Sequence, residues 1–597
     1  MKIPSSSLRL AVLGMVCTAA LLQAEDYTLG SDSQPQNGIP KGSVTKYVLP
    51  PGAFYPGTPH NYAVYVPAQY STASPAPFMV FLDGSSFLND KVRAPVVLDN
   101  LIAKHELPPL IGIFVDPGVL PTVSEAVQNR FERVFEYDSL SDRYSRFLLE
   151  ELIPAVGKKY NLAKDPDSHA ISGISTGAVG AFMAAWNRPD HFHRVLSFIG
   201  TYVAMKGADT LPAIVRKTEP KPIRIFLQDG RKDHIVPAEP YGTFYAGSWP
   251  INNEVMFQAF EYAGYDAKLV MGEEAHNMKQ GAAILPEALR WLWRDYPNPV
   301  LVHEPAAMKQ PGWDPRGKVY SIVSAQQGWQ QMGGTYSTIT NPTSDKGGNV
   351  FFAEPSSNRI YKSDPDGSVT IFRENSGGAQ ALRAGPDGRL YAYEAARRRI
   401  VSYGAGGDEK ILAQNVDAND IVVTAKSTLY FADAEHGKIG YIDATGKSHI
   451  AYEARDIARA FGLALSPDQA MLIVTDEIAR YSWSFQIDRD GSLINGEPFY
   501  RLEVPEAGWK SSVTGVMEDS TGQVYFATPL GVQVCEANGR LAAILNPPGH
   551  GPISGLTFAG TTPTWLYVTE GGKLYRRSVK VASTALDNPV KPPKPAL

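Results

Sequence analysis

Cysteine is almost absent from this 597-residue chain: Cys17 and Cys535 are the only two, which excludes a fold held together by several disulfide bonds. Basic residues are not in excess, because 56 Lys and Arg stand against 61 Asp and Glu for a formal net charge of -5. Nucleic acid is therefore not an expected partner. The chain also lacks an apolar run of the roughly 20 residues that a membrane-spanning helix needs. What is present is the composition of an ordinary globular protein, whose length predicts roughly two to four domains.

Residues 1–24 have the pattern of an export signal. Lys2 and Arg9 precede an apolar run from Leu10 to Leu22 that is too short for a membrane anchor. We therefore predict a cleaved signal peptide, a periplasmic or extracellular protein, and no membrane span in the mature chain. The mature chain would keep one cysteine, Cys535, whose surroundings "GVQVCEA" predict a buried structural thiol.

After a polar leader at 25–43, residues 44–297 alternate short apolar runs with helical patterns. The runs "FMVFLDG", "HAISGIS" and "IRIFLQDG" are typical of buried strands, and "SDRYSRFLLEELIPAVGKKY" repeats apolar residues at helical spacing. This alternation predicts an α/β domain with a mostly parallel sheet covered by helices on both faces. A proline-containing linker is predicted at 298–316.

The pattern changes at 317–580, where one strand motif recurs six times. It reads "NVFFAE", "RLYAYE", "TLYFAD", "MLIVTD", "QVYFAT" and "WLYVTE", with turn signals such as "GPDG" between strands. Six repeats of about 40 residues predict an all-β domain, a six-bladed β-propeller, rather than a β-sandwich. The Pro/Lys-rich tail at 581–597 is predicted to be disordered and is given no role.

Gly173-Ile174-Ser175-Thr176-Gly177 fits the pattern G-x-S-x-G between a predicted strand and a predicted helix. In that setting a serine on a sharp turn exposes its hydroxyl, and the small flanking residues let the turn close. We interpret Ser175 as the candidate nucleophile. The alternative is a Gly/Ser turn that serves only close helix packing.

A serine nucleophile needs a base, and the base needs an orienting acid, in the chain order Ser, Asp or Glu, His. Two later strands have candidates just beyond their ends, in "QDGRKDH" and "GEEAHNM". We predict Asp233 as the acid in preference to Asp229, which belongs to the tight "QDG" turn. We predict His276 as the base in preference to His234, which adjoins the acid.

The oxyanion that forms on an ester carbon needs two N–H donors. The backbone N–H of Thr176 is one candidate. The turn after "FMVFLDG" offers the N–H of Gly84 or of Ser85 as the second, although this turn is equally compatible with an ordinary structural role.

Several segments of residues 44–297 resemble a known esterase family. They are "NRFERVFEYDSLSDRYSRFLLEELIPAVGKKY", "HAISGISTGAVGAFMAAWNRPDHFHRVLSFIGTY", "IRIFLQDGRKDH" and "GYDAKLVMGEEAHNMKQGAAILPEALRWLWRDYP". The family includes enterochelin, feruloyl and acetyl-xylan esterases. The resemblance implies an α/β-hydrolase fold, with Ser175, Asp233 and His276 as nucleophile, acid and base. Thr176 departs from the second serine that enterochelin-type members often have, but a threonine still supplies the N–H.

The repeats resemble the gluconolactonase and senescence-marker-protein family through "NDIVVTAKSTLYFAD", "GLALSPDQAMLIVTD" and "GQVYFATPLGVQV". That family binds a divalent metal through a glutamate, an asparagine and an aspartate, and such oxygen ligands suit Ca²⁺. The resemblance places Phe461 at the asparagine and Thr514 at the aspartate, and the glutamate has no clear match. We predict that this metal site is absent, although Asn419-Asp420 matches a further polar pair of the family.

Acidic residues also recur at one position of the repeated strand motif. A ligand site is one interpretation, but the regular repeat favours hydrogen bonding at the blade edges. These residues are Glu354, Glu394, Asp433, Asp476 and Glu570.

Together the patterns predict an exported serine carboxylic-ester hydrolase that needs no metal or organic cofactor, with the propeller as a binding or scaffolding module. The expected substrate is a small-molecule or glycan ester, such as a feruloylated or acetylated glycan or a siderophore ester, because fold alone does not choose the substrate. The alternatives are a metal-dependent gluconolactonase-type lactonase in the propeller and a non-enzymatic glycan-binding protein.

Overall fold

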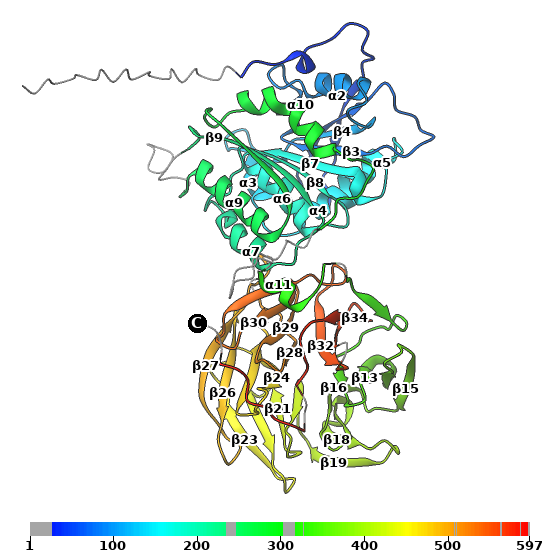
Figure 1. Ribbon diagram of the computed structural model, residues 1–597, viewed down its shortest axis with the longest axis vertical. Coiled ribbons are helices and arrows are strands. Elements are labelled where there is room, and N and C mark those ends of the chain that lie inside the picture. Colours follow the sequence, from blue (N-terminus) through cyan, green and yellow to red (C-terminus); the bar gives the residue numbers. More distant parts are fainter. Residues whose placement is uncertain are drawn as a thin grey trace, which may run out of the picture.

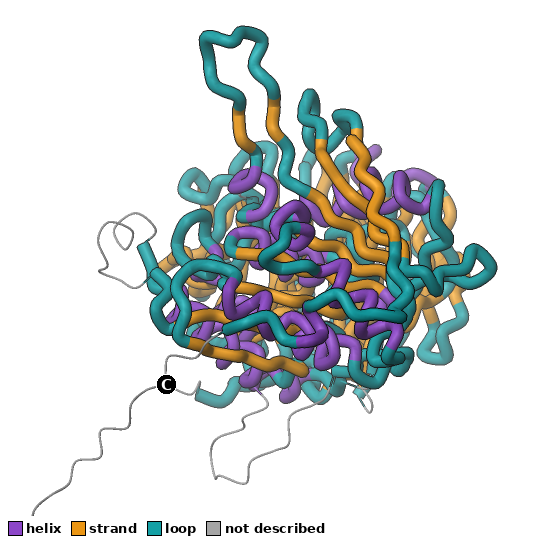
Figure 2. Tube along the Cα trace, turned by 90° about the horizontal axis from the view of Figure 1, so that it is seen from above, coloured by secondary structure: helices purple, strands orange, loops and turns teal. Residues whose placement is uncertain are grey.

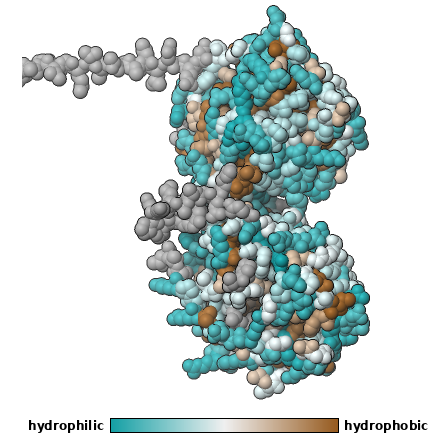
Figure 3. Space-filling view, turned by 45° about the vertical axis from the view of Figure 1, so that its right-hand side comes forward, coloured by the Kyte–Doolittle hydropathy of each residue, from teal (hydrophilic) through white to brown (hydrophobic). Residues whose placement is uncertain are grey.

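The computed structural model describes residues 27–234, 246–302, 317–325, 327–506, 508, 510–561, 564–584 and 587–594. The chain forms two lobes with a narrower waist, an N-terminal lobe of helices and strands and a C-terminal lobe of strands (Figures 1 and 3). Within the described residues no helix is long and apolar enough to span a membrane. The predicted signal peptide and most of the predicted linker lie outside these residues.

The N-terminal lobe is built on one eight-stranded sheet in the order β1-β2-β4-β3-β7-β8-β9-β10. The pairings of β2 with β1 and with β4 are antiparallel, and the other pairings are parallel. In sheet order the strands are Ser43–Leu49, His60–Val66, Ile111–Val115, Phe78–Leu82, His169–Ile174, Arg194–Phe198, Arg224–Gly230 and Asp266–Gly272. The central strands are buried along their whole length, which is why their sequences are continuous apolar runs. The sequence patterns missed β1, an edge strand that is mostly exposed.

Helices cover both faces of this sheet, as predicted (Figure 1), and in the view from above they lie over the strands (Figure 2). α1, α2 and α10 contribute to the apolar core on one face, and α4 to α7 and α9 contribute to the core on the other. The helices are α1 Gly84–Leu88, α2 Ala94–Ala103, α3 Arg133–Tyr137, α4 Arg143–Phe147, α5 Ile153–Gly157, α6 Thr176–Asn187, α7 Leu211–Lys217, α9 Trp249–Ala263, α10 Lys279–Trp293 and α11 Gly317–Ile322. A small hairpin, β5 (Val119–Leu120) and β6 (Arg130–Phe131), is inserted before α3. The strand order and the helical crossovers are those of an α/β-hydrolase, which confirms the predicted fold class.

The C-terminal lobe is the predicted six-bladed β-propeller, with six four-stranded sheets. The repeated motif forms the second strand of each blade, namely β13, β17, β21, β25, β29 and β33. β11 pairs with β34, so that the first strand of the domain completes the last blade. The first two blades are β12 (Thr343–Ser344), β13 (Val350–Glu354), β14 (Arg359–Ser363) and β15 (Val369–Glu374), and β16 (Ala379–Ala384), β17 (Leu390–Glu394), β18 (Arg399–Tyr403) and β19 (Glu409–Gln414). The third and fourth are β20 (Asp420–Val423), β21 (Leu429–Asp433), β22 (Lys438–Ile442) and β23 (Ser448–Glu453), and β24 (Ala460–Leu465), β25 (Met471–Asp476), β26 (Tyr481–Ile487) and β27 (Leu493–Arg501). The fifth is β28 (Gly515–Glu518), β29 (Val524–Thr528), β30 (Gly531–Cys535) and β31 (Leu541–Leu545), and the sixth joins β32 (Ile553–Ala559), β33 (Thr564–Glu570) and β34 (Lys573–Val579) to β11 (Gln330–Met332).

The two lobes meet at the edge of the N-terminal sheet where β8 and β9 begin. Thr218, just before β9, forms a parallel bridge with Ile544 on the outer strand of the fifth blade. The Glu219 carboxylate accepts two hydrogen bonds from the nearly buried guanidinium of Arg577, at 2.9 and 2.6 Å. β8 and β9 are parallel, so their amino ends lie at one edge of the sheet and their carboxyl ends at the other. The propeller therefore docks at the edge with the amino ends.

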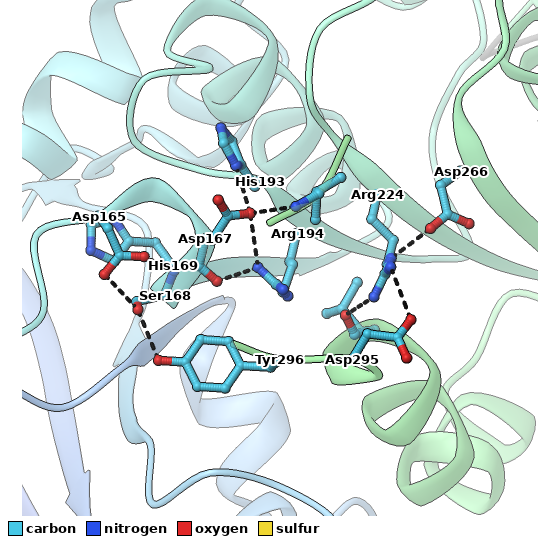
Figure 4. Close-up of polar contacts among 12 residues, drawn as sticks. Asp165, Asp167, Ser168, His169, His193, Arg194, Arg224, Asp266, Asp295 and Tyr296 are labelled. Atoms are coloured by element: carbon cyan, nitrogen blue, oxygen red, sulfur yellow. Dashed lines mark hydrogen bonds and ion pairs between the residues drawn. The ribbon is translucent and has the colours of Figure 1, made fainter. Parts of the chain in front are cut away.

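A polar cluster lies at the same edge of the sheet (Figure 4). Arg194, the first residue of β8, is fully buried and donates to the backbone carbonyl of Asp167. His193 Nδ1 lies 2.9 Å from the Asp167 carboxylate, which also accepts a 2.7 Å hydrogen bond from the Val300 N–H. The cluster therefore anchors the start of the linker to the N-terminal lobe.

The C-terminal tail differs from the prediction where the structure describes it. The Ser520 N–H donates to the carbonyl of Ala582 at 3.0 Å, and the Val590 N–H donates to the carbonyl of Pro467 at 2.8 Å. A proline-rich composition predicted disorder, but the described residues of the tail lie against the propeller and satisfy its backbone groups.

Candidate active site

Ser175 occupies the sharp turn between β7 and α6. Its backbone has φ 58° and ψ -120°, a combination that non-glycine residues rarely adopt. A Cβ atom on Gly173 would lie 1.9 Å from the carbonyl oxygen of Gly177, and a Cβ on Gly177 would lie 2.9 Å from Oδ2 of Asp83. The glycines are therefore required by close approach of backbone and side chain, and the strained turn is the geometry that the G-x-S-x-G pattern predicts.

The structure brings Ser175, His276 and Asp233 together. His276 Nε2 lies 3.0 Å from Oγ of Ser175, and its Nδ1 lies 2.9 Å from both carboxylate oxygens of Asp233. Asp233 is fully buried and also accepts a 2.6 Å hydrogen bond from the His234 N–H, whereas His276 keeps part of its side chain exposed. In the tautomer with the proton on Nδ1, His276 donates to Asp233 and accepts from the Ser175 hydroxyl.

The two alternative residues lie beside this arrangement. Asp229, at the end of β9, accepts a hydrogen bond from the Gly230 N–H at 2.8 Å, as the turn interpretation predicts. The ring of His234 stacks on the ring of His276 with centroids 4.8 Å apart. Burial, and to a smaller extent the nearby His276, lowers the pKa of His234.

Sequence reasoning missed Thr201, which follows β8. Its Oγ1 lies 3.0 Å from Oγ of Ser175 and accepts a 3.2 Å hydrogen bond from the indole N–H of Trp249, at the start of α9. Because the indole can only donate, one lone pair of Thr201 is already used, which favours donation of the Thr201 proton toward Ser175. No motif marks this residue, since the contact joins positions 26 residues apart.

The oxyanion candidates differ in what surrounds them. Thr176 and Gly84 are the first residues of α6 and α1, and the first N–H groups of a helix have no partner within it. The Ser85 N–H instead donates to the Asp116 carboxylate at 2.9 Å. Of the two predicted alternatives, Gly84 is thus the residue whose N–H the helix geometry leaves for a ligand.

Arg133 is a second residue that sequence reasoning missed. Its guanidinium donates to both carboxylate oxygens of Asp83, at 2.8 and 2.7 Å, and to the carbonyl of Ile174 at 3.0 Å. Arg133 therefore ties the turn that carries Gly84 to the turn that carries Ser175.

A groove of about 820 Å³ begins at α1 and runs over β4, β2 and β1. Val44, Val48, Leu88 and Phe114 form its apolar part, and Asp116 lies where it meets Ser85. An apolar surface of this kind next to an oxyanion turn can hold the hydrophobic part of an ester.

Asp233, His234 and His276 could also hold a metal ion, because one ligand atom from each lies within 4.8 Å of the others. In the described geometry, however, both ring nitrogens of His276 are already engaged, one by Asp233 and one by Ser175. A metal here would have to displace the Ser175 contact.

The propeller residues do not fit the metal site that its resemblance implies. Phe461 and Thr514 stand at the beginning of the inner strands β24 and β28, where neither an aromatic ring nor a neutral hydroxyl replaces an asparagine and an aspartate ligand. Asp420 is buried and pairs with Arg383 at 3.1 Å, and the neighbouring Asn419 accepts from the Ala434 N–H. This polar pair is accounted for by contacts within the propeller.

The recurring acids make local contacts, as predicted. Glu394, for example, accepts hydrogen bonds from Tyr403 and Arg399, and Asp476 accepts from the backbone N–H groups of Ala458 and Ile478. Cys535, also as predicted, is a buried free thiol in β30.

A separate cavity of about 270 Å³ is lined by residues at the carboxyl ends of the inner strands of the propeller. Residues from all six blades contribute, among them Arg383 and Glu518, and residues of the tail, Thr584 and Asp587, lie at its wall. The cavity is large enough for a small polar molecule, although smaller than most ligand pockets.

Comparisons with known proteins agree with this division of the chain. Residues 55–284 match the family model "Esterase", and residues 342–572 match the model "SMP-30/Gluconolactonase/LRE-like region". The protein thus joins an esterase-family domain to a gluconolactonase-like propeller. These matches support hydrolase activity and are compatible with an esterase or a lactonase-like reaction.

Individual relatives are distant. A gluconolactonase of Zymomonas mobilis is 24% identical over 277 residues, which are 39% of this chain and 76% of that protein. An endo-1,4-beta-xylanase/feruloyl esterase of Xylanibacter ruminicola is 24% identical over 182 residues, 30% of this chain and only 20% of that protein. Among solved structures, an enterobactin esterase from Shigella flexneri has 17% identity and a TM-score of 0.34, covering 44% of this chain and 62% of the other.

Proposed function

We propose that the protein is an exported serine carboxylic-ester hydrolase whose catalytic residues are Ser175, His276 and Asp233. The observation that carries the proposal is the continuous contact from Ser175 Oγ through the imidazole of His276 to the buried carboxylate of Asp233, on a strained strand-to-helix turn. This is the arrangement that activates a serine hydroxyl toward a carbonyl carbon.

In the proposed reaction, Ser175 Oγ attacks the ester carbonyl while His276 Nε2 takes the hydroxyl proton. The N–H groups of Thr176 and Gly84 stabilise the oxyanion, and Asp233 stabilises the imidazolium. His276 then gives the proton to the leaving alcohol, and an acyl-enzyme ester on Ser175 remains. Water, deprotonated by His276, hydrolyses this ester and restores the free serine.

The substrate proposal is an ester with an apolar or aromatic acyl part, such as a feruloylated glycan, outside the cytoplasm. The apolar groove beside α1 supports the acyl part, and the predicted export signal supports the location. A siderophore ester is the alternative. The propeller is proposed as a binding or scaffolding module, and its inner cavity is the candidate binding surface.

A lactonase reaction in the propeller is the second candidate function, favoured by the family match of residues 342–572. Phe461 and Thr514 argue against it, because the residues present do not supply the implied metal ligands. No reaction step through a metal is therefore proposed.

The test is hydrolysis of a small aryl ester by the purified protein, with Ser175→Ala and with Ser124→Ala, an exposed serine, as the matched control. We expect loss of at least about a thousandfold in kcat/KM for Ser175→Ala, none for Ser124→Ala, and no effect of a chelator. A serine-directed phosphonate should label wild type and Ser124→Ala only. Full activity of Ser175→Ala would overturn the proposal. Loss of activity on chelation would instead favour a metal-dependent reaction.

A further inference from the structure

Asp229 is a second buried carboxyl group next to the acid of the proposed triad. It lies at the end of β9, four positions before Asp233, and both residues have no exposed surface. The reaction as proposed does not use Asp229. An isolated buried carboxylate is costly, so its surroundings must either neutralise it or keep it protonated.

Two neutral donors, one from the backbone and one from an amide side chain, contact Asp229. Oδ1 accepts from the Gly230 N–H at 2.8 Å, and Oδ2 accepts from the side-chain amide of Asn253 at 2.9 Å. Asn253, on α9, is also fully buried and donates to the carbonyl of Gly200 at 2.8 Å. Within the described residues, Asp229 forms no ion pair.

The charged groups around Asp229 are those of the triad region. On the side of the turn, the carboxyl group of Asp233 acts on the charge state of Asp229, and Asp233 in turn contacts His276 and the backbone of His234. α9 presents neutral Asn253, and the nearest arginine of the turn, Arg231, lies close to Glu273 and Glu254 instead. Two buried carboxyl groups thus lie four positions apart, and within the described residues only the imidazole of His276 forms an ion pair with either of them.

Burial and the charge of Asp233 raise the pKa of Asp229 to about 9, burial being the larger cause. At neutral pH Asp229 is then a carboxylic acid, and its O–H can donate where a second carboxylate would repel.

We propose that Asp229 is a positioning residue that stays a neutral acid and donates its O–H to the carboxylate of Asp233. This inference rests on the proposed function of Asp233 as the acid that orients His276. The donated hydrogen bond holds the Asp233 carboxylate against His276 Nδ1, and the neutral form leaves one negative charge, rather than two, beside the imidazole. α9 supports both ends of the triad, since Asn253 holds Asp229 and Trp249 holds Thr201 beside Ser175.

The experiment compares wild type with Asp229→Asn, a neutral side chain that can still donate, and Asp229→Leu, which cannot. We expect kcat/KM of wild type to fall as the pH rises through about 9, because ionised Asp229 repels Asp233. Asp229→Asn should keep kcat/KM within about tenfold of wild type at pH 7.5 and should not show the fall at alkaline pH. Asp229→Leu should lose about a hundredfold in kcat with little change in KM. Thermal unfolding of each variant checks that it is folded.

A second measurement does not depend on turnover. The infrared difference spectrum of wild type minus Asp229→Asn at pH 7.5 should contain the carbonyl band of a protonated carboxyl group, and this band should disappear from the difference above pH 9. An Asp229→Asn variant that is folded but as inactive as Asp229→Leu, or that keeps the alkaline fall, would overturn the proposal. Failure of the proposed function is distinguishable, because Ser175→Ala would then stay active while the infrared band still reports on Asp229.

Discussion

The guanidinium of Arg133 holds the carboxylate of Asp83 through two hydrogen bonds of 2.8 and 2.7 Å, and a third, to the carbonyl of Ile174, reaches the residue before the nucleophile. Asp83 itself has a positive φ of 56° and begins the turn that leads into α1. One side chain therefore fixes the distance between the two turns that would bind an oxyanion.

Arg133→Met should lower kcat by about tenfold to a hundredfold while KM changes little, because displacement of an oxyanion donor is felt mainly in the transition state. The measurement is steady-state hydrolysis of an aryl ester. Arg130→Met is the matched control, since Arg130 is largely exposed and its ion pair is with Glu132, which belongs to neither turn. Equal losses in the two variants, or a change confined to KM, would contradict a role for Arg133 in holding these turns.

Gly173→Ala should prevent folding of the N-terminal lobe rather than reduce turnover in a folded protein. The added Cβ would lie 1.9 Å from the backbone oxygen of Gly177, which cannot move without breaking the start of α6. Gly157→Ala is the control, because a Cβ there meets nothing within 4 Å, and alanine is favoured over glycine in a helix by roughly 1 kcal/mol. Soluble expression and thermal unfolding measure both. A Gly173→Ala protein with wild-type stability would contradict the close approach of residue 173 to the backbone oxygen of Gly177.

The parts of the protein that were predictable are those that local patterns encode. The strands around Ser175 are continuous apolar runs because both faces are covered, and the propeller repeats because each blade repeats its contacts. Thr201 and Arg133 escaped prediction because their partners lie 26 to 50 positions away and no motif links them. The tail was misjudged for a related reason: its composition resists regular structure, but hydrogen bonds to loops of the propeller hold the described part of it.

Glu219→Ala should uncouple the two lobes. It leaves Arg577, only 3% exposed, without the carboxylate that neutralises it, and an unpaired buried charge costs about 3 to 5 kcal/mol. Differential scanning calorimetry should then show two separate transitions where wild type shows one. Lys217→Ala is the control at the same interface, since Lys217 is 30% exposed and lies 3.5 Å from Glu503, so this pair contributes little. Identical calorimetric traces for wild type and Glu219→Ala would exclude this role for Glu219.

Glu518→Gln should stabilise the propeller, and more so at alkaline than at acidic pH. Glu518 is buried beside the inner cavity, and its Oε2 has no hydrogen-bond partner among the described residues. Burial, together with the charges of Asp519 and Asp468, raises its pKa to about 9 from a usual value of 4.5. The folded state therefore keeps a proton that the unfolded chain releases above pH 4.5. Its contribution to stability is full below that pH and is lost as the pH rises toward 9.

A glutamine stays neutral in both states and carries no such cost. At pH 8 the variant should gain more than about 1 kcal/mol over wild type, since each pKa unit corresponds to about 1.4 kcal/mol, and at pH 5 the difference should nearly vanish. Thermal unfolding at the two pH values measures this, with Glu497→Gln on the exposed outer strand of the fourth blade as the control. A gain of equal size at pH 5 and pH 8 would mean that the pKa of Glu518 is not raised in the folded protein.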